Sequence, residues 1–291
     1  PTEAEGAGEI LPLELTGSIA ASSSTYGDAL EPGTPTLDNV LSGDAVAATV
    51  TVDPSGNTSS SGNLEAGSYN GIQTVTALTG AQASNYSIGI TPGDYTVDPR
   101  ALQGSIATET TTYGDALVEG SVSFSNRVSG DDVTASVAID TSGRTSSSGN
   151  LEAGSYTGIQ TVDSLNGADA GNYTNAVSAG DYTVDPLVLT GSIATSTTTY
   201  GDDLVAGTVT YDNRVSGDSV SAEIIIATTG NTSTSGNLEA GTYTGIQSVD
   251  ALTGDDAANY TSGISAGDYT VNKRALTGAA IAAASSTYGN S

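Results

Sequence analysis

The chain has 291 residues, with 33 acidic side chains against 6 basic ones and a formal net charge of −27 at pH 7. This balance argues against nucleic acid or an anionic membrane as a partner, since both are bound by clustered Lys or Arg. Cys and His are absent, which excludes disulfides, thiolate chemistry and imidazole catalysis. The acidity instead fits a cationic partner or counterion, calcium included.

Residues 1–13 precede the first regular pattern, and we interpret them as a leader or the end of a preceding unit. They have neither the basic nor the apolar stretch of a signal peptide. Apolar runs approaching the ~20 residues of a membrane span are also absent from the sequence. We therefore expect the chain to be an internal piece of a longer protein, with its targeting signals elsewhere.

Three units of 87 residues follow, because Tyr26, Tyr113 and Tyr200 each begin a YGD triplet at that spacing. Other motifs, including NLEAG and GDYTV, recur in the same register. Each unit is longer than a solenoid repeat of roughly 20–45 residues and can bury a small core of its own. The predicted boundaries are residues 14–99 for repeat 1, 100–186 for repeat 2, 187–272 for repeat 3, and 273–291 for the first strand of a fourth, truncated repeat.

Within each repeat the predicted elements are short strands. Apolar and polar residues alternate, and Val, Ile, Thr and Tyr are enriched. In repeat 3 this alternation covers residues 189–195, 207–213, 218–226, 241–249 and 267–271. Clusters of Gly, Ser, Thr and Asn separate the strands, and helix is limited to a single turn near residues 166–172. The pattern predicts an all-β fold with little helix, either β-grasp-like or small sandwich modules.

The joints between repeats contain no flexible linker. The GDYTVDP strand of one repeat leads directly into the next, with only Pro99 or Pro186 between them. Proline fixes its own φ angle and favours extended backbone in the residue before it. The third joint carries Lys273 and Arg274 in place of proline. We expect three tandem domains in an elongated rod, on the order of 100 Å long from the size of compact domains.

The sequence offers no catalytic constellation. Adjacent carboxylates occur at Asp131–Asp132, Asp202–Asp203 and Asp255–Asp256. Neighbours on a strand point to opposite faces, and no base, nucleophile or phosphate loop accompanies these pairs. We interpret them as solvated turns, and predict that the chain is not an enzyme and has no catalytic or cofactor-binding residues.

Calcium is the metal that the composition favours, because only oxygen ligands remain without His and Cys. The candidate ligands are Asp131, Asp132, Asp169, Asp255 and Asp256. Their loops match no calcium-binding loop pattern, and the counterpart in repeat 1, residues 79–85, has no carboxylate. We therefore predict no required cofactor. The alternative interpretation of these loops is an Asx-type turn or a helix cap.

Tyrosine recurs at four places in each repeat, which in repeat 2 are Tyr113, Tyr156, Tyr173 and Tyr182. An aromatic row would stack on sugar rings, but the chain has no Trp and one Phe, so its tyrosines must fill the core. The pattern favours core packing over carbohydrate binding. Acceptor patterns for N-glycosylation occur at Asn57, Asn85, Asn172, Asn231 and Asn259.

Three motifs in a fixed order resemble a known family. Each repeat has a TYGD start, a Gly-Asp segment and an Asn-Tyr pair near its end. The Gly-Asp segments lie at Gly43–Asp44, Gly130–Asp131 and Gly217–Asp218, and the Asn-Tyr pairs at Asn85–Tyr86, Asn172–Tyr173 and Asn259–Tyr260. This order resembles the YDG and MBG (mostly β-grasp) tandem-repeat domains of filamentous-haemagglutinin-like bacterial adhesins secreted by the two-partner route. The resemblance covers nearly the whole chain, which departs from the family in its scarcity of Lys and its NLEAG motif.

The resemblance implies a structural stalk or spacer of a large surface adhesin, which extends an adhesive region from the cell and supports cell–cell or biofilm adhesion. It places the chain outside the cell, at the bacterial surface or in the biofilm matrix. Its partners would be neighbouring repeats of the same chain and other copies of itself, and the family supplies no catalytic residues to transfer.

Two alternatives remain from the sequence. One is a self-assembling extracellular fibre, in which the spare strand of residues 275–284 completes a unit of a neighbouring molecule. The other is a calcium-dependent or carbohydrate-binding repeat module.

Overall fold

The computed structural model of the protein describes residues 9–278, 280–281, 283–286 and 288. Its internal contacts divide the chain into two compact units. Unit 1 comprises Pro1–Glu109, Glu119–Asp140 and Thr157–Tyr182, and unit 2 comprises Thr110–Val118, Thr141–Tyr156 and Thr183–Ser291. The division therefore passes through repeat 2. The predicted repeat boundaries and the rod stay predictions, and each unit is described by itself.

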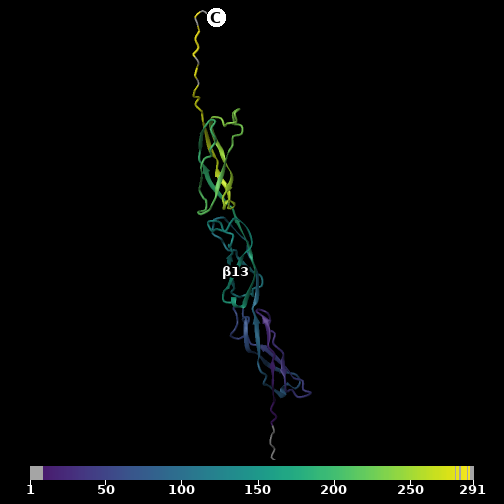
Figure 1. Ribbon diagram of the computed structural model, residues 1–291. Helices are drawn as coiled ribbons and strands as arrows, with labels where there is room; N and C mark the ends of the chain where they lie inside the picture. Colours follow the sequence, from purple (N-terminus) through teal and green to yellow (C-terminus); the bar gives the residue numbers. More distant parts are fainter. Residues whose placement is uncertain (1–8, 279, 282, 287, 289–291) are drawn as a thin grey trace, which may run out of the picture. The chain divides into compact units, whose positions relative to one another are not determined.

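The regular secondary structure of the described residues is nearly all β, as the alternation predicts (Figure 1). Helical structure in this part of the chain is limited to three 3-10 turns, η1 (Ala83–Asn85), η2 (Ala170–Asn172) and η3 (Ala257–Asn259). They recur at the same place in each repeat, where the sequence predicts a single helical turn. None of the described helices is long and apolar enough to cross a membrane.

The strands of unit 1 are β1 (Leu13–Leu15), β2 (Gly17–Ile19), β3 (Ser22–Thr25), β4 (Pro35–Leu37), β5 (Ala47–Val52), β6 (Gly67–Thr79), β7 (Tyr86–Ile88), β8 (Gly93–Asp98), β9 (Arg100–Ile106), β11 (Val122–Phe124), β12 (Thr134–Ile139) and β14 (Tyr173–Ser178). Those of unit 2 are β16 (Leu187–Ile193), β17 (Ser196–Thr199), β18 (Val209–Tyr211), β19 (Ser221–Ile226), β20 (Gly241–Thr253), β21 (Tyr260–Ser265) and β22 (Gly267–Asn272). Three strands contribute residues to both units, namely β10 (Glu109–Thr112), β13 (Gly154–Asn166) and β15 (Gly180–Asp185).

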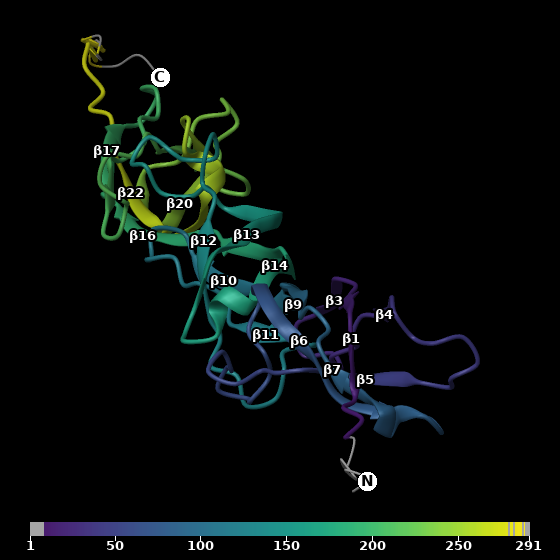
Figure 2. The same cartoon turned by 90° about the horizontal axis from the view of Figure 1, so that it is seen from below.

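Repeat 3 shows the arrangement of one repeat. One sheet has the order β18-β16-β21, and the other has the order β17-β22-β20-β19. Figure 2 labels β16 of the first sheet and β17, β22 and β20 of the second. In each sheet, the strand that comes first in the sequence pairs in parallel with a strand from the end of the repeat. These pairs are β16 with β21 and β17 with β22. Repeat 1 keeps the four-stranded sheet as β3-β8-β6-β5 and divides the other into the pairs β1-β7 and β2-β4.

In repeat 1 the four-stranded sheet and the strand pairs opposite it share a core. Leu15 on β1 and Tyr86 on β7 are buried, and Val50 on β5 and Val75 on β6 pack against that cluster. Side chains of a strand alternate between faces, so each sheet supplies one apolar face to this core. Two packed sheets without a covering helix agree with the sandwich, one of the two architectures that the sequence leaves open.

A buried glutamine explains part of the recurring GIQ segment. Gln73 is 0 % exposed and lies where the pairing of β6 with β8 shifts register. Its Oε1 accepts a hydrogen bond from the Gly33 N–H (2.5 Å), and its Nε2 donates to the carbonyls of Ala20 (3.2 Å) and Asp94 (2.6 Å). Gln160 and Gln247 make the same three bonds in the other repeats. Because a buried amide must be paired, this residue connects three segments of each repeat.

Candidate functional site

Two successive repeats meet within unit 1 around a buried carboxylate. Tyr26 directly follows β3 and is 0 % exposed, while Asp131 of repeat 2 is 5 % exposed. The Tyr26 hydroxyl donates to Asp131 Oδ2 at 2.7 Å, and the Tyr173 hydroxyl donates to the same oxygen at 2.6 Å. The two rings meet edge to face, with centroids 5.3 Å apart. Hydrogen bonds to an ionised acceptor are roughly twice as strong as neutral ones, so this cluster ties repeat 1 to repeat 2.

The turn around η2 adds two acceptors to this junction. Asp169 Oδ1 accepts from the Ser60 N–H of repeat 1 at 3.0 Å, and Oδ2 accepts from the Asp132 N–H of its own repeat at 2.8 Å. Asn172 Oδ1 accepts from the Ala66 N–H at 2.7 Å. Ser60 and Ala66 lie on either side of the NLE segment. The NLEAG loop of one repeat therefore docks on the Asp-to-Asn turn of the next.

The joint itself is held by Arg100, the first residue of β9. Its Nε donates to the Tyr26 carbonyl at 2.7 Å, and its guanidinium forms an ion pair with Asp28. The side chain thus fixes the YGD turn of repeat 1 against the entry strand of repeat 2. This contact is half-exposed, so we attribute to it positioning more than stability.

The junction between repeats 2 and 3 lies within unit 2 and repeats these contacts. Tyr113 and Tyr260 both donate to Asp218 Oδ2 at 2.6 Å, and their ring centroids are 5.4 Å apart. Asp256 accepts from the N–H groups of Ser147 (3.0 Å) and Ser219 (2.7 Å), and Asn259 accepts from that of Ala153 (2.8 Å). Each junction is thus internal to one compact unit.

The environment shifts the pKa values of these groups in two directions. Burial, followed by the hydrogen bond to Asp131, raises the pKa of Tyr173 far above its ordinary value, and the same causes raise that of Tyr260 beside Asp218. Burial opposes ionisation of Asp169 and Asp256, but their backbone N–H donors outweigh it and lower both pKa values. The junctions therefore favour the neutral form of Tyr173 and Tyr260 and the ionised form of Asp169 and Asp256. One oxygen of each central carboxylate, Asp131 Oδ1 and Asp218 Oδ1, is buried without a hydrogen-bond partner among the described residues.

The five predicted calcium candidates divide between junction and surface. Asp131, Asp169 and Asp256 are buried and accept hydrogen bonds at the junctions, whereas Asp132 and Asp255 are exposed. Asp132 Oδ2 accepts a long hydrogen bond from the Ala168 N–H, at 3.3 Å. In the described part of the chain, no three His, Cys, Asp or Glu side chains are grouped so that they could hold a metal ion. The prediction that no cofactor is required and the calcium alternative both stay untested.

Two local interpretations of these aspartates are wrong. Asp131 and Asp256 are not solvated, because a neighbouring repeat covers them. Asp169 and Asp256 stand at the N-cap positions of η2 and η3 but make no side-chain capping hydrogen bond. Their oxygens instead accept from loops that are distant in sequence, where more N–H donors are available.

The predicted tyrosine packing is confirmed for Tyr113, Tyr173 and Tyr182, which are at most 6 % exposed, whereas Tyr156 is half-buried. Among the glycosylation patterns, Asn172 and Asn259 are buried and hydrogen-bonded at the junctions and so are inaccessible in the folded chain. The sequence did not reveal the tyrosine–aspartate pairing. Tyr26 and Asp131 are 105 residues apart, whereas the Asp of the same motif within repeat 1, Asp44, is 18 residues from Tyr26.

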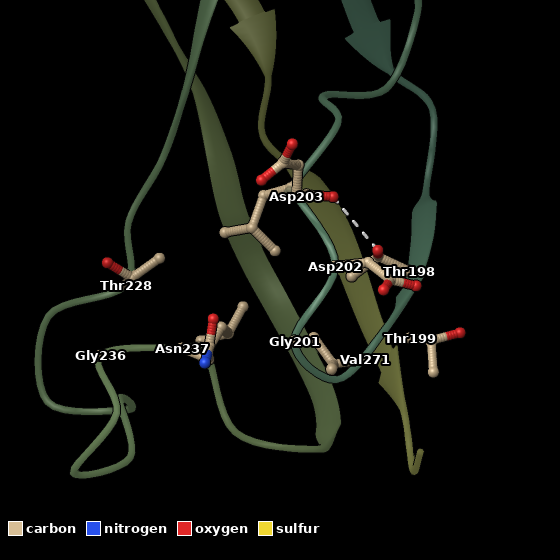
Figure 3. Close-up of a pocket in the computed structure, with 11 residues that line it drawn as sticks. Thr198, Thr199, Gly201, Asp202, Asp203, Thr228, Gly236, Asn237 and Val271 are labelled. Atoms are coloured by element: carbon tan, nitrogen blue, oxygen red, sulfur yellow. Dashed lines mark hydrogen bonds between the residues drawn. The ribbon is translucent and has the colours of Figure 1, made fainter. Parts of the chain in front are cut away.

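A small polar cavity recurs beside the YGD turn. In repeat 3 it has a volume of about 250 Å³ and lies between Asp202, Thr228 and Asn237 (Figure 3). A hydrogen bond of 3.2 Å from Thr198 Oγ1 to the Asp203 carbonyl closes one side. Corresponding cavities occur in repeat 2 and repeat 1. Because no aromatic side chain lines any of the three, they lack the stacking surface of a sugar site.

Comparison of the chain with family models, with curated proteins and with solved structures finds no match. The resemblance to the YDG and MBG repeats therefore stays a prediction from the motifs.

Proposed function

We propose that the chain is a structural spacer segment of a secreted bacterial surface adhesin, whose repeats are held in a fixed relation to their neighbours. One observation carries the proposal: both junctions contain the same buried cluster of two tyrosines and one aspartate. A chain selected only to fold each repeat separately would not need these residues, because each cluster combines side chains from two repeats. The extracellular site and the adhesin context rest on the motif resemblance.

The contacts suit a load-bearing role better than a catalytic one. Their side chains are buried and already hydrogen-bonded to each other, so none is presented to a substrate. The large negative charge would keep such long molecules soluble and would make neighbouring molecules repel at low salt.

Small-angle X-ray scattering of the whole chain tests the spacer function. Three compact domains held in line give a maximum dimension on the order of 100 Å. We expect this dimension to change, and the scattering to indicate a broader ensemble, when Asp131 and Asp218 are both replaced by Ala. A maximum dimension well under roughly 80 Å for the unaltered chain would contradict the proposal.

Strand exchange by residues 275–284 is less well supported. In repeats 2 and 3 the apolar Leu and Ile of the first strand are four residues apart, as in Leu102 and Ile106, and so lie on one face. Leu276 and Ile281 are five apart, which would place them on opposite faces. The two side chains are 94 % and 99 % exposed.

A further inference from the structure

The sequence contains two Asn-Gly pairs, Asn70–Gly71 in repeat 1 and Asn166–Gly167 in repeat 2. Asparagine before glycine is prone to spontaneous deamidation, because glycine has no side chain to hinder attack of its backbone nitrogen on the asparagine amide. The other repeats have threonine at the corresponding positions, which are Thr157 and Thr244 for Asn70 and Thr79 and Thr253 for Asn166. The fold therefore requires asparagine at neither position.

The second pair lies where the two reacting groups are accessible and weakly held. Asn166 is the last residue of β13, and its side chain is exposed. The hydrogen bonds of its amide group with Ser136 and Ser164 are 3.4–3.5 Å long and therefore weak. Gly167 follows the strand, and its N–H donates no hydrogen bond within the described part of the chain. The Gly167 nitrogen is thus free to approach the Asn166 side chain.

The first pair has a protected nitrogen. Asn70 lies within β6 and is also exposed, but the Gly71 N–H donates to Asp94 Oδ1 at 2.9 Å. The glycine nitrogen attacks only after it loses its proton, so this hydrogen bond must first break. The negative charge of the bonded carboxylate also opposes ionisation of the nitrogen. At the second pair, the nearby Asp132 carboxylate accepts instead from the Ala168 N–H, at 3.3 Å. The two pairs should therefore differ in rate.

We propose that Asn166 is a deamidation site of the folded chain. The Gly167 nitrogen loses its proton and forms a bond to Asn166 Cγ, while the Cγ–Nδ2 bond breaks and the amide nitrogen takes up a proton and leaves as ammonia. The product is a cyclic imide. Water then adds across either of its two carbonyl–nitrogen bonds. Opening of one bond gives aspartate, and opening of the other gives isoaspartate, whose main chain runs through the former side-chain carbonyl carbon. Water is the only co-reactant.

Isoaspartate at position 166 would disturb the junction between repeats 1 and 2. It lengthens the main chain by a carbon atom shortly before Asp169, which accepts from the N–H groups of Ser60 and Asp132. The turn that leads to Asp169 is tight, because Gly167 has a φ of +109° and a Cβ there would lie 2.3 Å from the Asp132 carbonyl oxygen. The added atom should therefore displace Asp169 and weaken the docking of the NLEAG loop. This inference does not rest on the spacer function.

Timed incubation of the whole chain at neutral pH, followed by peptide mapping with mass spectrometry, tests the proposal. We expect Asn166 to deamidate roughly tenfold or more faster than Asn70, because only the Asn70 reaction must break a hydrogen bond to a carboxylate. In concentrated urea, where that hydrogen bond is lost, the two rates should become similar. Asn166→Thr should abolish the fast conversion, and Asn70→Thr should leave it unchanged. Both variants carry the residue that the other repeats have at that position.

Urea denaturation of fresh and aged samples, both carrying Asn70→Thr, tests the effect on the junction. The midpoint should fall as isoaspartate accumulates, and it should stay constant when Asn166→Thr is also present. The deamidation site would be overturned if Asn70 reacted as fast as Asn166 in the folded chain, or if Asn166 stayed intact while the urea-unfolded chain reacted. An unchanged midpoint after conversion to isoaspartate would overturn the effect on the junction.

Discussion

At the scale of single residues, the junction depends on one carboxylate oxygen that accepts from tyrosines of two repeats. Asp131 and Asp218 each hold this position. Among the described residues, neither has a hydrogen-bond partner for its second carboxylate oxygen. The sequence indicated that the tyrosines are core residues, and this was correct for the rings of Tyr26, Tyr113, Tyr173 and Tyr260. It could not show where the hydroxyls go, because their acceptors lie in another repeat.

Replacing Tyr26 by Phe should measure how much the junction depends on the hydrogen bond to this carboxylate oxygen. We expect Tyr26→Phe to lower the free energy of unfolding by about 2 kcal/mol, since it removes a buried hydrogen bond to a charged acceptor. Urea denaturation measures the change, with Tyr288→Phe as the control at an exposed site. A loss below about 0.5 kcal/mol, the usual range for surface substitutions, would argue against the cluster.

Alkaline pH should weaken the junctions. The pKa values of Tyr173 and Tyr260 are raised in the folded chain, so their contribution is fully present below the unfolded value near 10. It should be lost progressively as the pH rises above 10, because the tyrosines of the unfolded chain ionise there while Tyr173 and Tyr260 of the folded chain stay neutral. Thermal unfolding between pH 8 and 11 would show this as a fall in Tm that begins near pH 10, and a flat profile would contradict it.

Acidic pH should weaken the junctions as well, through different residues. The pKa values of Asp169 and Asp256 are lowered on folding, so their contribution is present above the unfolded value near 4 and lost as the pH falls below it. We expect an Asp169→Ala, Asp256→Ala double variant to show a smaller acid-induced fall in Tm than the unaltered chain. An identical fall in both proteins would show that these carboxylates are not responsible.

Chelation should leave the protein unchanged if the buried aspartates serve the junctions. Asp131, Asp169 and Asp256 are engaged by O–H and N–H donors, which a bound cation would have to displace. We expect the same Tm with excess EDTA and with millimolar calcium. A rise in Tm with calcium would restore the calcium interpretation.

At the scale of elements, the sequence predicted strands, turn clusters and the single helical turn, because period-two alternation and Gly-rich turns are local signals. It missed the buried glutamines. A polar side chain is normally expected to face solvent, but Gln73 is four residues from Tyr69 and two from Val75, so alternation places it on the same inward face of β6.

Replacing this glutamine should be costly. Gln247→Leu would leave the Gly207 N–H and the carbonyls of Ala194 and Asp268 without their partner. We expect a loss of about 3 kcal/mol or more in the free energy of unfolding, since each unpaired buried group costs about 1–3 kcal/mol. Thr242→Ala on the exposed face of β20 is the matched control and should cost far less.

At the scale of the whole molecule, the 87-residue period predicted three repeats, and the equivalent strands recur at that period. The period alone could not show that the YGD tyrosine of one repeat binds the aspartate of the Gly-Asp segment in the next repeat. Asp169 illustrates this, because repeat 1 has a glutamine at this position, and from the sequence that indicates only a loop that needs no carboxylate. The structure instead places the two aspartates of this position at junctions.

The central claim is that successive repeats are coupled through the tyrosine–aspartate cluster, and a double-mutant cycle measures this most directly. Tyr26→Phe and Asp131→Ala should show a coupling energy of about 1–3 kcal/mol in the free energy of unfolding. Tyr26 with Asp44 is the control pair, since no described residue bridges their side chains, and its effects should add within about 0.5 kcal/mol. Additive effects for Tyr26 and Asp131 as well would contradict the claim.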